Sequence, residues 1–238
     1  MLDAISAIIE QGVEELNIEL PPDAVAAFRA YYSFLEKHGQ HVNLTAISGV
    51  EEVARLHFLD SLALLNITAF EHKNVIDIGS GAGFPGVPLK IALPSIALTL
   101  LESKGKRIVF LSELCDEIGI TAECLYARAE EAAHKPDMRE RYDIAVSRAV
   151  ARLDALCELC LPFICIGGLL IAMKGVDSGD EISQAQNAVK TLGAELQGVC
   201  DYRLPGTNII HRAVLIRKIL KTPDKYPRRF ARIQNSPL

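Results

Sequence analysis

The spacing of apolar residues divides the chain into two parts. Over residues 1–65 the apolar positions recur every three or four residues, which is the period of an amphipathic helix. Pro21-Pro22 ends the first helix, and further helices are predicted over Val25–His38 and Glu51–Leu65, with a turn at Asn43-Leu44-Thr45 between them. We therefore expect an N-terminal helical extension over residues 1–65.

From Lys73 onward, short apolar runs rich in β-branched residues alternate with helical stretches. Strands are predicted at 75–79, 96–101, 121–127, 142–146, 168–173, 196–203 and 208–216. Helices are predicted at 87–93, 104–118, 129–133, 151–163 and 178–192. Such alternation is typical of a doubly wound, largely parallel sheet. Only Leu204-Pro205-Gly206 joins the last two strands, which is too short for a crossover helix, so this pair is expected to be antiparallel.

The predicted fold is therefore an α/β Rossmann-like sheet, mostly parallel with an antiparallel last strand, over residues 66–238. Of the 238 residues, 50% are hydrophobic, which allows a substantial buried core. The formal net charge of −5 argues against a protein that coats nucleic acid but permits a local basic patch.

Cysteine usage and hydropathy exclude further classes. The six cysteines show no disulfide framework, and Cys157 and Cys160 lack a second pair of ligands, so no metal or redox site is predicted. The first twelve residues lack the basic start of a secretory signal. The longest apolar stretch, Leu161–Met173, is interrupted and too short to span a bilayer. We expect a cytoplasmic protein that does not enter a membrane.

The stretch that carries the chemistry runs from Asp77 to Gly86, where a buried strand ends in closely spaced glycines before a helix. In this arrangement backbone N–H groups approach a ligand closely. Gly81 to Gly86 also fits the dinucleotide fingerprint G-x-G-x-x-G. The anionic Asp77 before the turn disfavours a pyrophosphate, and Pro85 removes an N–H from the helix start. Asp77 suits the ammonium group and hydroxyls of S-adenosylmethionine; a purely structural turn is the alternative.

Ligands of open α/β sheets bind beyond the carboxyl ends of the strands, so residues at those ends are candidates. Glu102 ends the second predicted strand and is placed to bond ribose hydroxyls, while Ala129-Glu130 follows the third and suits the adenine. Arg148 ends the fourth strand and suits a carboxylate or an RNA phosphate, and Lys174 ends the fifth. Glu102 and Glu130 also have purely structural interpretations, as a strand-end and a helix-start acid.

The C-terminal tail differs in composition from the rest of the chain. From residue 217 onward, seven basic residues stand against one acid, Asp224, with Tyr226 and Phe230 among them. Basic side chains interleaved with aromatic ones suit phosphate contact and base stacking, so RNA contact is predicted. A merely solvated charged tail is the alternative.

Taken together, these motifs resemble the RsmG family, also called GidB, the bacterial methyltransferases that modify guanine N7 in small-subunit ribosomal RNA. The resemblance covers nearly the whole chain in order, and its most specific parts are Asp77–Gly86 and Ser147-Arg148-Ala149-Val150. The other matching segments are Asn43-Leu44-Thr45, His57 with Asp60-Ser61-Leu62, Ala129-Glu130, Lys174-Gly175, Tyr202-Arg203-Leu204-Pro205 and Lys225-Tyr226-Pro227-Arg228-Arg229. The tail departs from the family, because Phe230-Ala231-Arg232-Ile233 stands where a Gly followed shortly by a Pro is usual.

The resemblance implies S-adenosylmethionine as the cofactor and small-subunit ribosomal RNA as the partner. The modest acidic charge favours RNA within a structured ribosomal particle, and we expect a monomer. Combined with the strand-end residues, it gives these expected cofactor contacts: Asp77, Gly79, Ser80, Gly81, Gly83, Phe84, Glu102, Ala129, Glu130 and Arg148. The expected RNA contacts are Arg148, Lys174, Arg203, Lys225, Arg228 and Arg229.

Guanine N7 offers a lone pair and carries no proton, so no general base, and hence no catalytic residue, is predicted. The rate would come from proximity and in-line alignment of the reacting atoms. Three alternatives stay open: methylation of a protein or small molecule, an NAD-dependent oxidoreductase, and a catalytically silent RNA-binding assembly factor. His57 and Asp60 share a helix face and have either a structural role or a contact with substrate.

Overall fold

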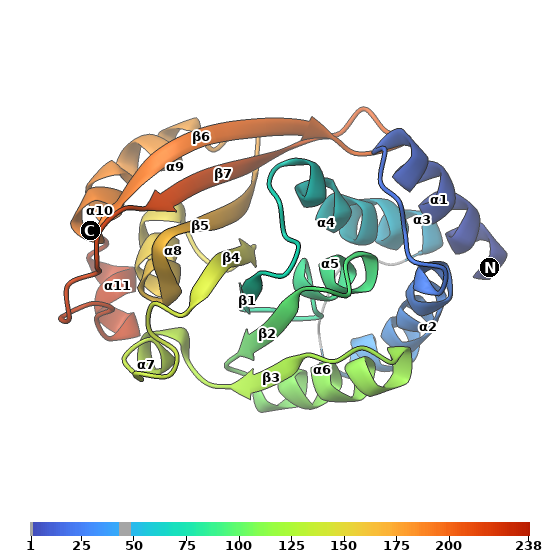
Figure 1. The fold of residues 1–238 in the computed structure, drawn as a ribbon, viewed down its shortest axis with the longest axis horizontal. Coiled ribbons are helices and arrows are strands. Elements are labelled where there is room, and N and C mark those ends of the chain that lie inside the picture. Colours follow the sequence, from blue (N-terminus) through green and yellow to red (C-terminus); the bar gives the residue numbers. More distant parts are fainter. Residues whose placement is uncertain (1, 43–48) are drawn as a thin grey trace.

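The predicted strands form one seven-stranded sheet in the order β3-β2-β1-β4-β5-β7-β6 (Figure 1). The structure, a computed structural model, describes residues 2–42 and 49–238, so the expected turn at Asn43-Leu44-Thr45 lies outside the described residues. The strands are β1 (Asn74–Ile78), β2 (Ala97–Glu102), β3 (Glu123–Tyr126), β4 (Tyr142–Arg148), β5 (Ile164–Gly175), β6 (Ala194–Arg203) and β7 (Ile210–Lys218). Strands β1 to β5 pair in parallel, and β7 is antiparallel to both neighbours, which confirms the predicted fold class.

Helices precede the sheet and connect its strands. The first two are α1 (Leu2–Glu15) and α2 (Ala24–Val42). A continuous helical segment follows, composed of α3 (Val50–Val53), a π-helical stretch (Ala54–Leu59), α4 (Asp60–Leu62) and a 3₁₀ turn (Ala63–Asn66). The later helices are α5 (Gly86–Ala92), α6 (Gly105–Ile118), α7 (Ala129–Ala132), α8 (Leu153–Cys160), α9 (Gly179–Gln184), α10 (Gln186–Thr191) and α11 (Phe230–Asn235).

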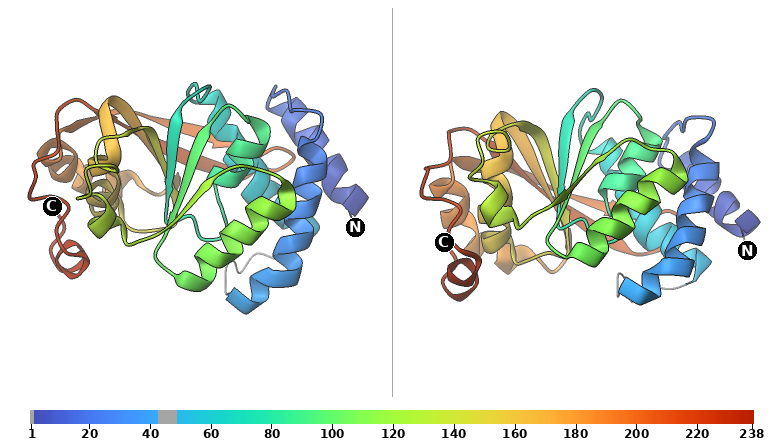
Figure 2. Two further views of the ribbon diagram at one scale, coloured as in Figure 1. Left: turned by 60° about the horizontal axis from the view of Figure 1, so that its bottom comes forward. Right: turned by 90° about the horizontal axis from the view of Figure 1, so that it is seen from below.

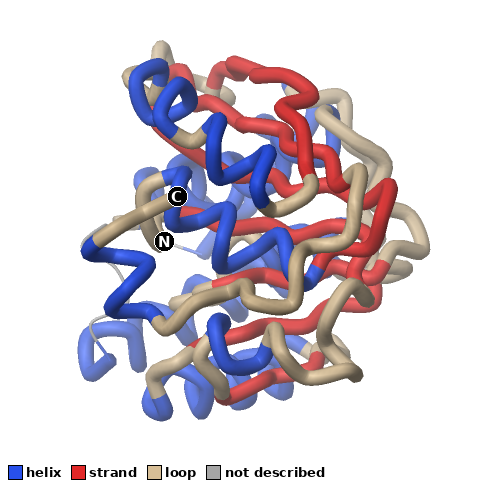
Figure 3. The backbone as a smooth tube through the Cα atoms, turned by 90° about the vertical axis from the view of Figure 1, so that its left-hand side faces the viewer, coloured by secondary structure: helices blue, strands red, loops and turns tan. Residues whose placement is uncertain are grey.

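Alternation along the strands creates two hydrophobic cores, one on each face of the sheet. Val75 contributes to the core beneath α1, α2, α5 and α6, whereas its neighbour Ile76 contributes to the core beneath α7, α8 and α10. Successive side chains of a strand point to opposite faces, which explains this division. The strands lie side by side in one twisted layer (Figure 3). The N-terminal helices and the C-terminal segment lie at opposite ends of the molecule (Figure 2).

The helices of residues 1–65 pack directly on the sheet. Ile5, Phe28, Tyr31 and Phe58 are buried in the same hydrophobic core as the strand residue Val75. The division into residues 1–65 and 66–238 therefore separates the chain by type of secondary structure, while the core is shared. The boundary itself stays a prediction.

Differences from the predicted elements concern β5, the helix at 178–192 and the C-terminal tail. Strand β5 begins at Ile164 rather than residue 168, because a bulge that contains Gly167 (φ +87°) lets the strand continue through the glycine pair. The helix predicted at 178–192 is interrupted at Ala185, between α9 and α10. The tail contains a helix, α11, that the pattern did not predict.

The basic tail is docked on the fold rather than merely solvated. Lys218 is fully buried at the end of β7, where its Nζ donates to Leu161 O (2.8 Å) and to the Thr222 hydroxyl, and burial lowers its pKa to about 8. The Arg139 guanidinium donates to the carbonyls of Thr222 and Tyr226 (2.8 and 2.9 Å).

Arg228 binds a buried acid of the sheet domain. Its Nε and Nη2 donate to Oε1 and Oε2 of Glu158 (2.9 and 2.7 Å), and the Arg228 backbone N–H donates to the same carboxylate (2.7 Å). Glu158 is completely buried in α8. Such a two-pronged pair holds the tail in a defined position.

We expect Glu158→Gln to lower the free energy of unfolding by about 3 kcal/mol, because it leaves Arg228 without its ionic partner in a mostly buried place. Denaturant unfolding measures the change, and Glu113→Gln, at an exposed position of α6, is the matched control. Equal stability of the two variants would show that the pair contributes nothing.

Candidate cofactor-binding site

The glycine turn lies at the carboxyl end of β1, in the centre of the sheet. Gly79, Gly81 and Gly83 all have positive φ (73°, 60° and 103°), which places the turn in backbone space that other residues rarely occupy. The N–H groups of Gly79 and Ser80 donate to Leu101 O on β2 (2.9 and 3.2 Å), and the Ser80 hydroxyl donates to Asp77 O (2.9 Å). The turn is therefore held by backbone and hydroxyl contacts to its two strands.

Asp77 is fully buried beneath this turn. Its Oδ2 accepts a hydrogen bond from Gly86 N, the first residue of α5, at 2.9 Å. A Cβ at residue 86 would lie 2.8 Å from the same Oδ2, so glycine is required there. No described donor lies within hydrogen-bond distance of Asp77 Oδ1. Burial raises the pKa of Asp77 to about 7, and the Gly86 N–H opposes that shift.

Glu102, at the end of β2, binds the other side of the turn. Its Oε2 accepts from Gly81 N (3.1 Å), its Oε1 accepts from Lys104 N (2.9 Å), and Arg107 lies 3.7 Å from Oε2. The carboxylate is buried rather than an exposed strand-end acid. Two carboxylates therefore flank the turn, at the place where a dinucleotide would put its pyrophosphate.

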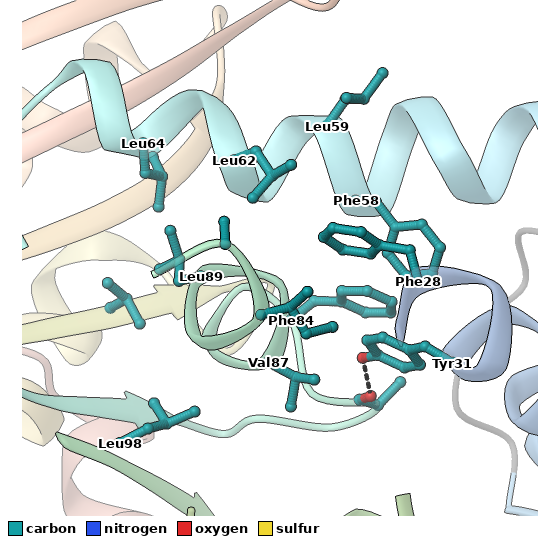
Figure 4. Packing of buried hydrophobic residues seen from close by; sticks show 14 of the residues in the cluster. Phe28, Tyr31, Phe58, Leu59, Leu62, Leu64, Phe84, Val87, Leu89 and Leu98 are labelled. Atoms are coloured by element: carbon teal, nitrogen blue, oxygen red, sulfur yellow. Dashed lines mark hydrogen bonds between the residues drawn. The ribbon is translucent and has the colours of Figure 1, made fainter. Parts of the chain in front are cut away.

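Phe84 fixes the far end of the turn to the N-terminal helices. Its ring stacks on Tyr31 of α2 (centroids 5.3 Å apart) and on His57 (4.5 Å) and packs against Phe58 (5.8 Å). Figure 4 shows Phe84 beside Tyr31 and Phe58. The Tyr31 hydroxyl donates to Ala82 O in the turn at 2.6 Å. The helices of residues 2–66 thus help to set the shape of the turn.

Arg148, at the end of β4, lies over the same aromatic ring. Its guanidinium carbon is 5.0 Å from the Phe84 centroid, a cation–π contact. Nη1 donates to Leu56 O (3.0 Å) and Asp60 Oδ2 (3.1 Å), and Nη2 lies 3.0 Å from His57 Nδ1. His57 Nδ1 also lies 3.0 Å from Leu56 O; because Arg can only donate, Nδ1 accepts from Arg148 when the neutral ring carries its proton on Nε2. A neutral ring agrees with the pKa of His57, which is lowered to about 4, mainly by burial and secondly by the charge of Arg148.

Asp60 is the hub of this network. The carboxylate is 1% exposed and binds three partners: Arg148 at Oδ2, and the Tyr202 hydroxyl and His211 Nδ1 at Oδ1, both at 2.8 Å. The hydrogen bond to Asp60 raises the pKa of His211 above its ordinary value. The network joins the N-terminal helices to the end of β4 and to the β6–β7 pair.

The other predicted site residues occupy different surroundings. Ala129 is buried at the start of α7, and Glu130 lies 3.7 Å from Arg128. The Lys174 ammonium donates to Ala151 O (2.8 Å) and to Glu181 (2.7 Å). Of the predicted RNA contacts, Arg203, Lys225 and Arg229 are exposed, whereas Arg228 is held by Glu158.

Sequence reasoning missed several residues that shape the site. Tyr31, Tyr202 and His211 reach it from 51 to 151 positions away along the chain. Val150 also lies against the turn, since a Cβ on Gly79 would be 2.5 Å from its Cγ2. An aromatic-rich α2 was visible in the sequence, but nothing local indicated its target.

The residues present fit S-adenosylmethionine better than a dinucleotide. The buried Asp77 Oδ1, which has no described donor, suits the ammonium group of the cofactor, and the Asp77 carboxylate already takes the N–H at the start of α5 that a phosphate would need.

None of the helices in the described residues is long and apolar enough to cross a membrane. The same part of the chain contains no cluster of three or more potential metal ligands.

A hollow of about 760 Å³ opens at the opposite edge of the sheet, beside the amino ends of the strands. There the Lys90 ammonium donates to Pro94 O and Ile96 O (2.8 and 2.6 Å), and Thr99 donates to Glu123 (3.0 Å). Its polar groups bind one another, whereas the carboxyl edge brings together the glycine turn and two buried acids. The candidate site is therefore at the carboxyl edge.

The sheet order, its one antiparallel strand and this turn define the class: a Rossmann-like methyltransferase that uses S-adenosylmethionine. The fold is also seen in the C9 mutein of the branched-chain polyamine synthase from Thermus thermophilus, with a TM-score of 0.56 at 15% identity, over 82% of this chain and 65% of that one.

Within this class, the family model for rRNA small subunit methyltransferase G matches residues 24–209. The ribosomal RNA small subunit methyltransferase G of Pelotomaculum thermopropionicum is 43% identical over 239 residues, which cover 100% of both chains. The protein of the same name from Alkaliphilus oremlandii is 43% identical over 233 residues, 97% of this chain and 98% of that protein. The chain belongs to this family, which confirms the resemblance found in the sequence.

Gly81 allows a direct test of the turn. A Cβ there would meet nothing closer than 3.8 Å, so Gly81→Ala is sterically tolerated and costs about 1–2 kcal/mol through its positive φ. We expect it to weaken S-adenosylmethionine binding at least tenfold, measured by calorimetric titration, because the methyl group fills the face of the turn. Gly119→Ala, with φ +71° and open space at the end of α6, is the matched control. Equal affinity of both variants would remove the turn from the site.

The hydrogen bond between Asp60 and His211 should make the stability of the protein depend on pH. We expect Asp60→Asn to return the pKa of His211 toward its ordinary value, followed by NMR titration of the imidazole. Because the folded-state pKa of His211 is raised, its contribution to stability is complete below the unfolded pKa of about 6.5 and is lost as pH rises through the folded value. The variant should lack this decline in unfolding free energy. Asp224→Asn, at an exposed position of the tail, is the control, and an unchanged His211 titration would contradict the network.

Proposed function

We propose that this protein transfers a methyl group from S-adenosylmethionine to N7 of a guanosine in small-subunit ribosomal RNA. The observation that carries the proposal is the glycine turn flanked by the buried carboxylates of Asp77 and Glu102. Membership of the rRNA small subunit methyltransferase G family supports the RNA substrate, and the family resemblance implies N7 of guanine as the acceptor.

Each side of the turn has a role in this proposal. Asp77 Oδ1 binds the ammonium group of the cofactor, and Glu102 exchanges its hydrogen bond from Gly81 N for one or both ribose hydroxyls. Ala129 and Glu130, beyond β3, contact the adenine. Gly79, Ser80, Gly83 and Phe84 shape the wall of the turn, and Arg148 packs on that wall through the Phe84 ring.

When bound, the cofactor supplies an electrophilic methyl group on a sulfonium. The chain needs to hold the guanine N7 in line with that methyl group, and it needs no base, because N7 carries no proton. The described titratable groups agree: Asp77 and Glu102 hydrogen-bond the turn, and His57 is already an acceptor for Arg148. We assign no catalytic residue, only groups that bind and position.

Contacts to RNA come from exposed cations. Arg203, Lys225 and Arg229 are exposed and are kept as RNA contacts. Lys174 and Arg228, which form ion pairs with Glu181 and Glu158, act by positioning their surroundings. The acidic net charge favours binding to a structured ribosomal particle through a limited basic surface. We also propose that the protein is a monomer that acts in the cytoplasm. A catalytically silent assembly factor is the second candidate, and it would be favoured if the protein transferred no methyl group to small subunits or to naked RNA.

Calorimetric titration with S-adenosylmethionine, S-adenosylhomocysteine and NAD tests the cofactor. We expect the first two to bind and NAD not to bind. Asp77→Asn should weaken S-adenosylmethionine about tenfold, the typical loss of one charge-assisted hydrogen bond, but should leave 5′-methylthioadenosine, which lacks the ammonium group, unchanged. Because a cation favours ionised Asp77, whose pKa is raised to about 7, affinity should fall as pH drops below 7.

Transfer of a labelled methyl group to small ribosomal subunits tests the acceptor. Nuclease digestion and chromatography should recover the label as 7-methylguanosine. Label in protein, or on another base atom, would overturn the assigned acceptor while leaving the cofactor site intact. Cofactor binding with no transfer to subunits or to naked RNA would favour the silent assembly factor.

A further inference from the structure

An exposed aromatic side chain lies beside the cofactor site and takes no part in the functions described above. Tyr126 is the last residue of β3, the edge strand of the sheet, and 65% of it is exposed to solvent. It pairs in register with Glu102 on β2. Neighbouring strands are about 4.8 Å apart, so the tyrosine stands one strand away from the acid assigned to the ribose.

The ring of Tyr126 lies beside Gly105 and has open space next to it. Atoms of the ring lie 3.9–4.0 Å from the position of a Cβ on Gly105, the first residue of α6, so the absence of a side chain there leaves room beside the ring. Val109 follows four residues later, on the same side of the helix, and is 55% exposed. Tyr126 at the carboxyl end of β3 and Val109 on α6 thus present apolar side chains to solvent on two neighbouring elements, β3 and α6 (Figure 1).

Three exposed cations are close to Tyr126 and Gly105 along the chain. Lys104 and Lys106 are exposed at the start of α6, and the Arg128 side chain is 57% exposed just after β3. Glu130 lies 3.7 Å from Arg128 and offsets part of its charge, but its own side chain is only 10% exposed. We call Lys104, Lys106, Val109, Tyr126 and Arg128 the β3–α6 surface.

We propose that the β3–α6 surface binds single-stranded RNA next to the target guanosine, with one base stacked on Tyr126 and the flanking phosphates near the three cations. The proposal rests on the proposed function, since it takes RNA as the substrate. Aromatic stacking combined with basic side chains is how proteins hold unpaired nucleotides without reading their sequence. Two of the seven basic residues of the tail, Lys218 and Arg228, are held in internal ion pairs, so they do not serve as contacts for these phosphates.

The test compares Tyr126→Ala with Tyr126→Phe in methyl transfer to small subunits and in binding of a fluorescein-labelled single-stranded RNA. We expect Tyr126→Ala to raise KM for subunits and Kd for the RNA about tenfold, within the range of one lost base stack, with kcat and the Kd of S-adenosylmethionine unchanged. Tyr126→Phe keeps the ring and should behave as the wild type. Loss in both variants would assign the effect to the hydroxyl and overturn stacking.

The salt dependence of RNA binding tests the role of the lysines separately. Replacement of both Lys104 and Lys106 by Ala should reduce the slope of log Kd against log salt by about 1.4, since each phosphate contact on a single strand contributes about 0.7. Lys190→Ala, at an exposed position of α10 far along the chain, should leave the slope unchanged.

Three outcomes separate this inference from the proposed function. If the wild type methylates subunits but Tyr126→Ala has normal RNA affinity and KM, the β3–α6 surface is wrong and the function stands. A weaker Kd for S-adenosylmethionine in Tyr126→Ala would make the tyrosine a cofactor contact and likewise overturn the surface. If the wild type transfers no methyl group to RNA, the proposed function fails.

Discussion

A single buried carboxylate, that of Asp60, joins the parts of this molecule that the chain keeps far apart. Burying a charge is costly unless it is paired and hydrogen-bonded, and Asp60 meets both conditions through Arg148, Tyr202 and His211. These partners come from β4, β6 and β7, while Asp60 itself belongs to the helices before the sheet. None of these elements can shift without leaving a buried charge short of a partner. The network also helps to hold the glycine turn in place, because Arg148 lies directly over Phe84.

The turn shows how electrostatics selects among similar motifs. A glycine-rich loop between a strand and a helix offers N–H groups to any ligand, and the spacing from Gly81 to Gly86 also fits a dinucleotide-binding loop. Here the Gly81 and Gly86 N–H groups bind the carboxylates of Glu102 and Asp77. Negative charge therefore stands where a pyrophosphate would have to lie, whereas an ammonium group and hydroxyls find acceptors. The same fold is thereby directed to a phosphate-free cofactor.

Local sequence patterns were sufficient for the parallel sheet and for the turn. The alternation of strands and helices and the short Leu204–Gly206 connection predicted the topology, because each depends on neighbours within about ten residues. Asp77, just before the turn, and Glu102, at the end of β2, could be placed at strand ends for the same reason. Partners distant in the sequence were not: Tyr202 and His211 are 142 and 151 positions from Asp60. The tail shows the limit most clearly, since its composition indicated free cations, while Arg228 is paired with Glu158 from 70 positions earlier.

The stacking of Tyr31 on Phe84 has a consequence for anyone who divides this protein. The helices before β1 look like an appendage on a complete nucleotide-binding sheet, and such a sheet is an attractive minimal catalytic fragment. Yet Tyr31, Phe58 and His57 form three sides of the enclosure around Phe84, and the Tyr31 hydroxyl binds Ala82 O within the turn. A fragment that begins at β1 would expose an aromatic ring and a buried carbonyl at the place proposed for the cofactor. The smallest functional unit therefore includes the helical segment, and exchanging that segment between relatives amounts to redesigning the cofactor site.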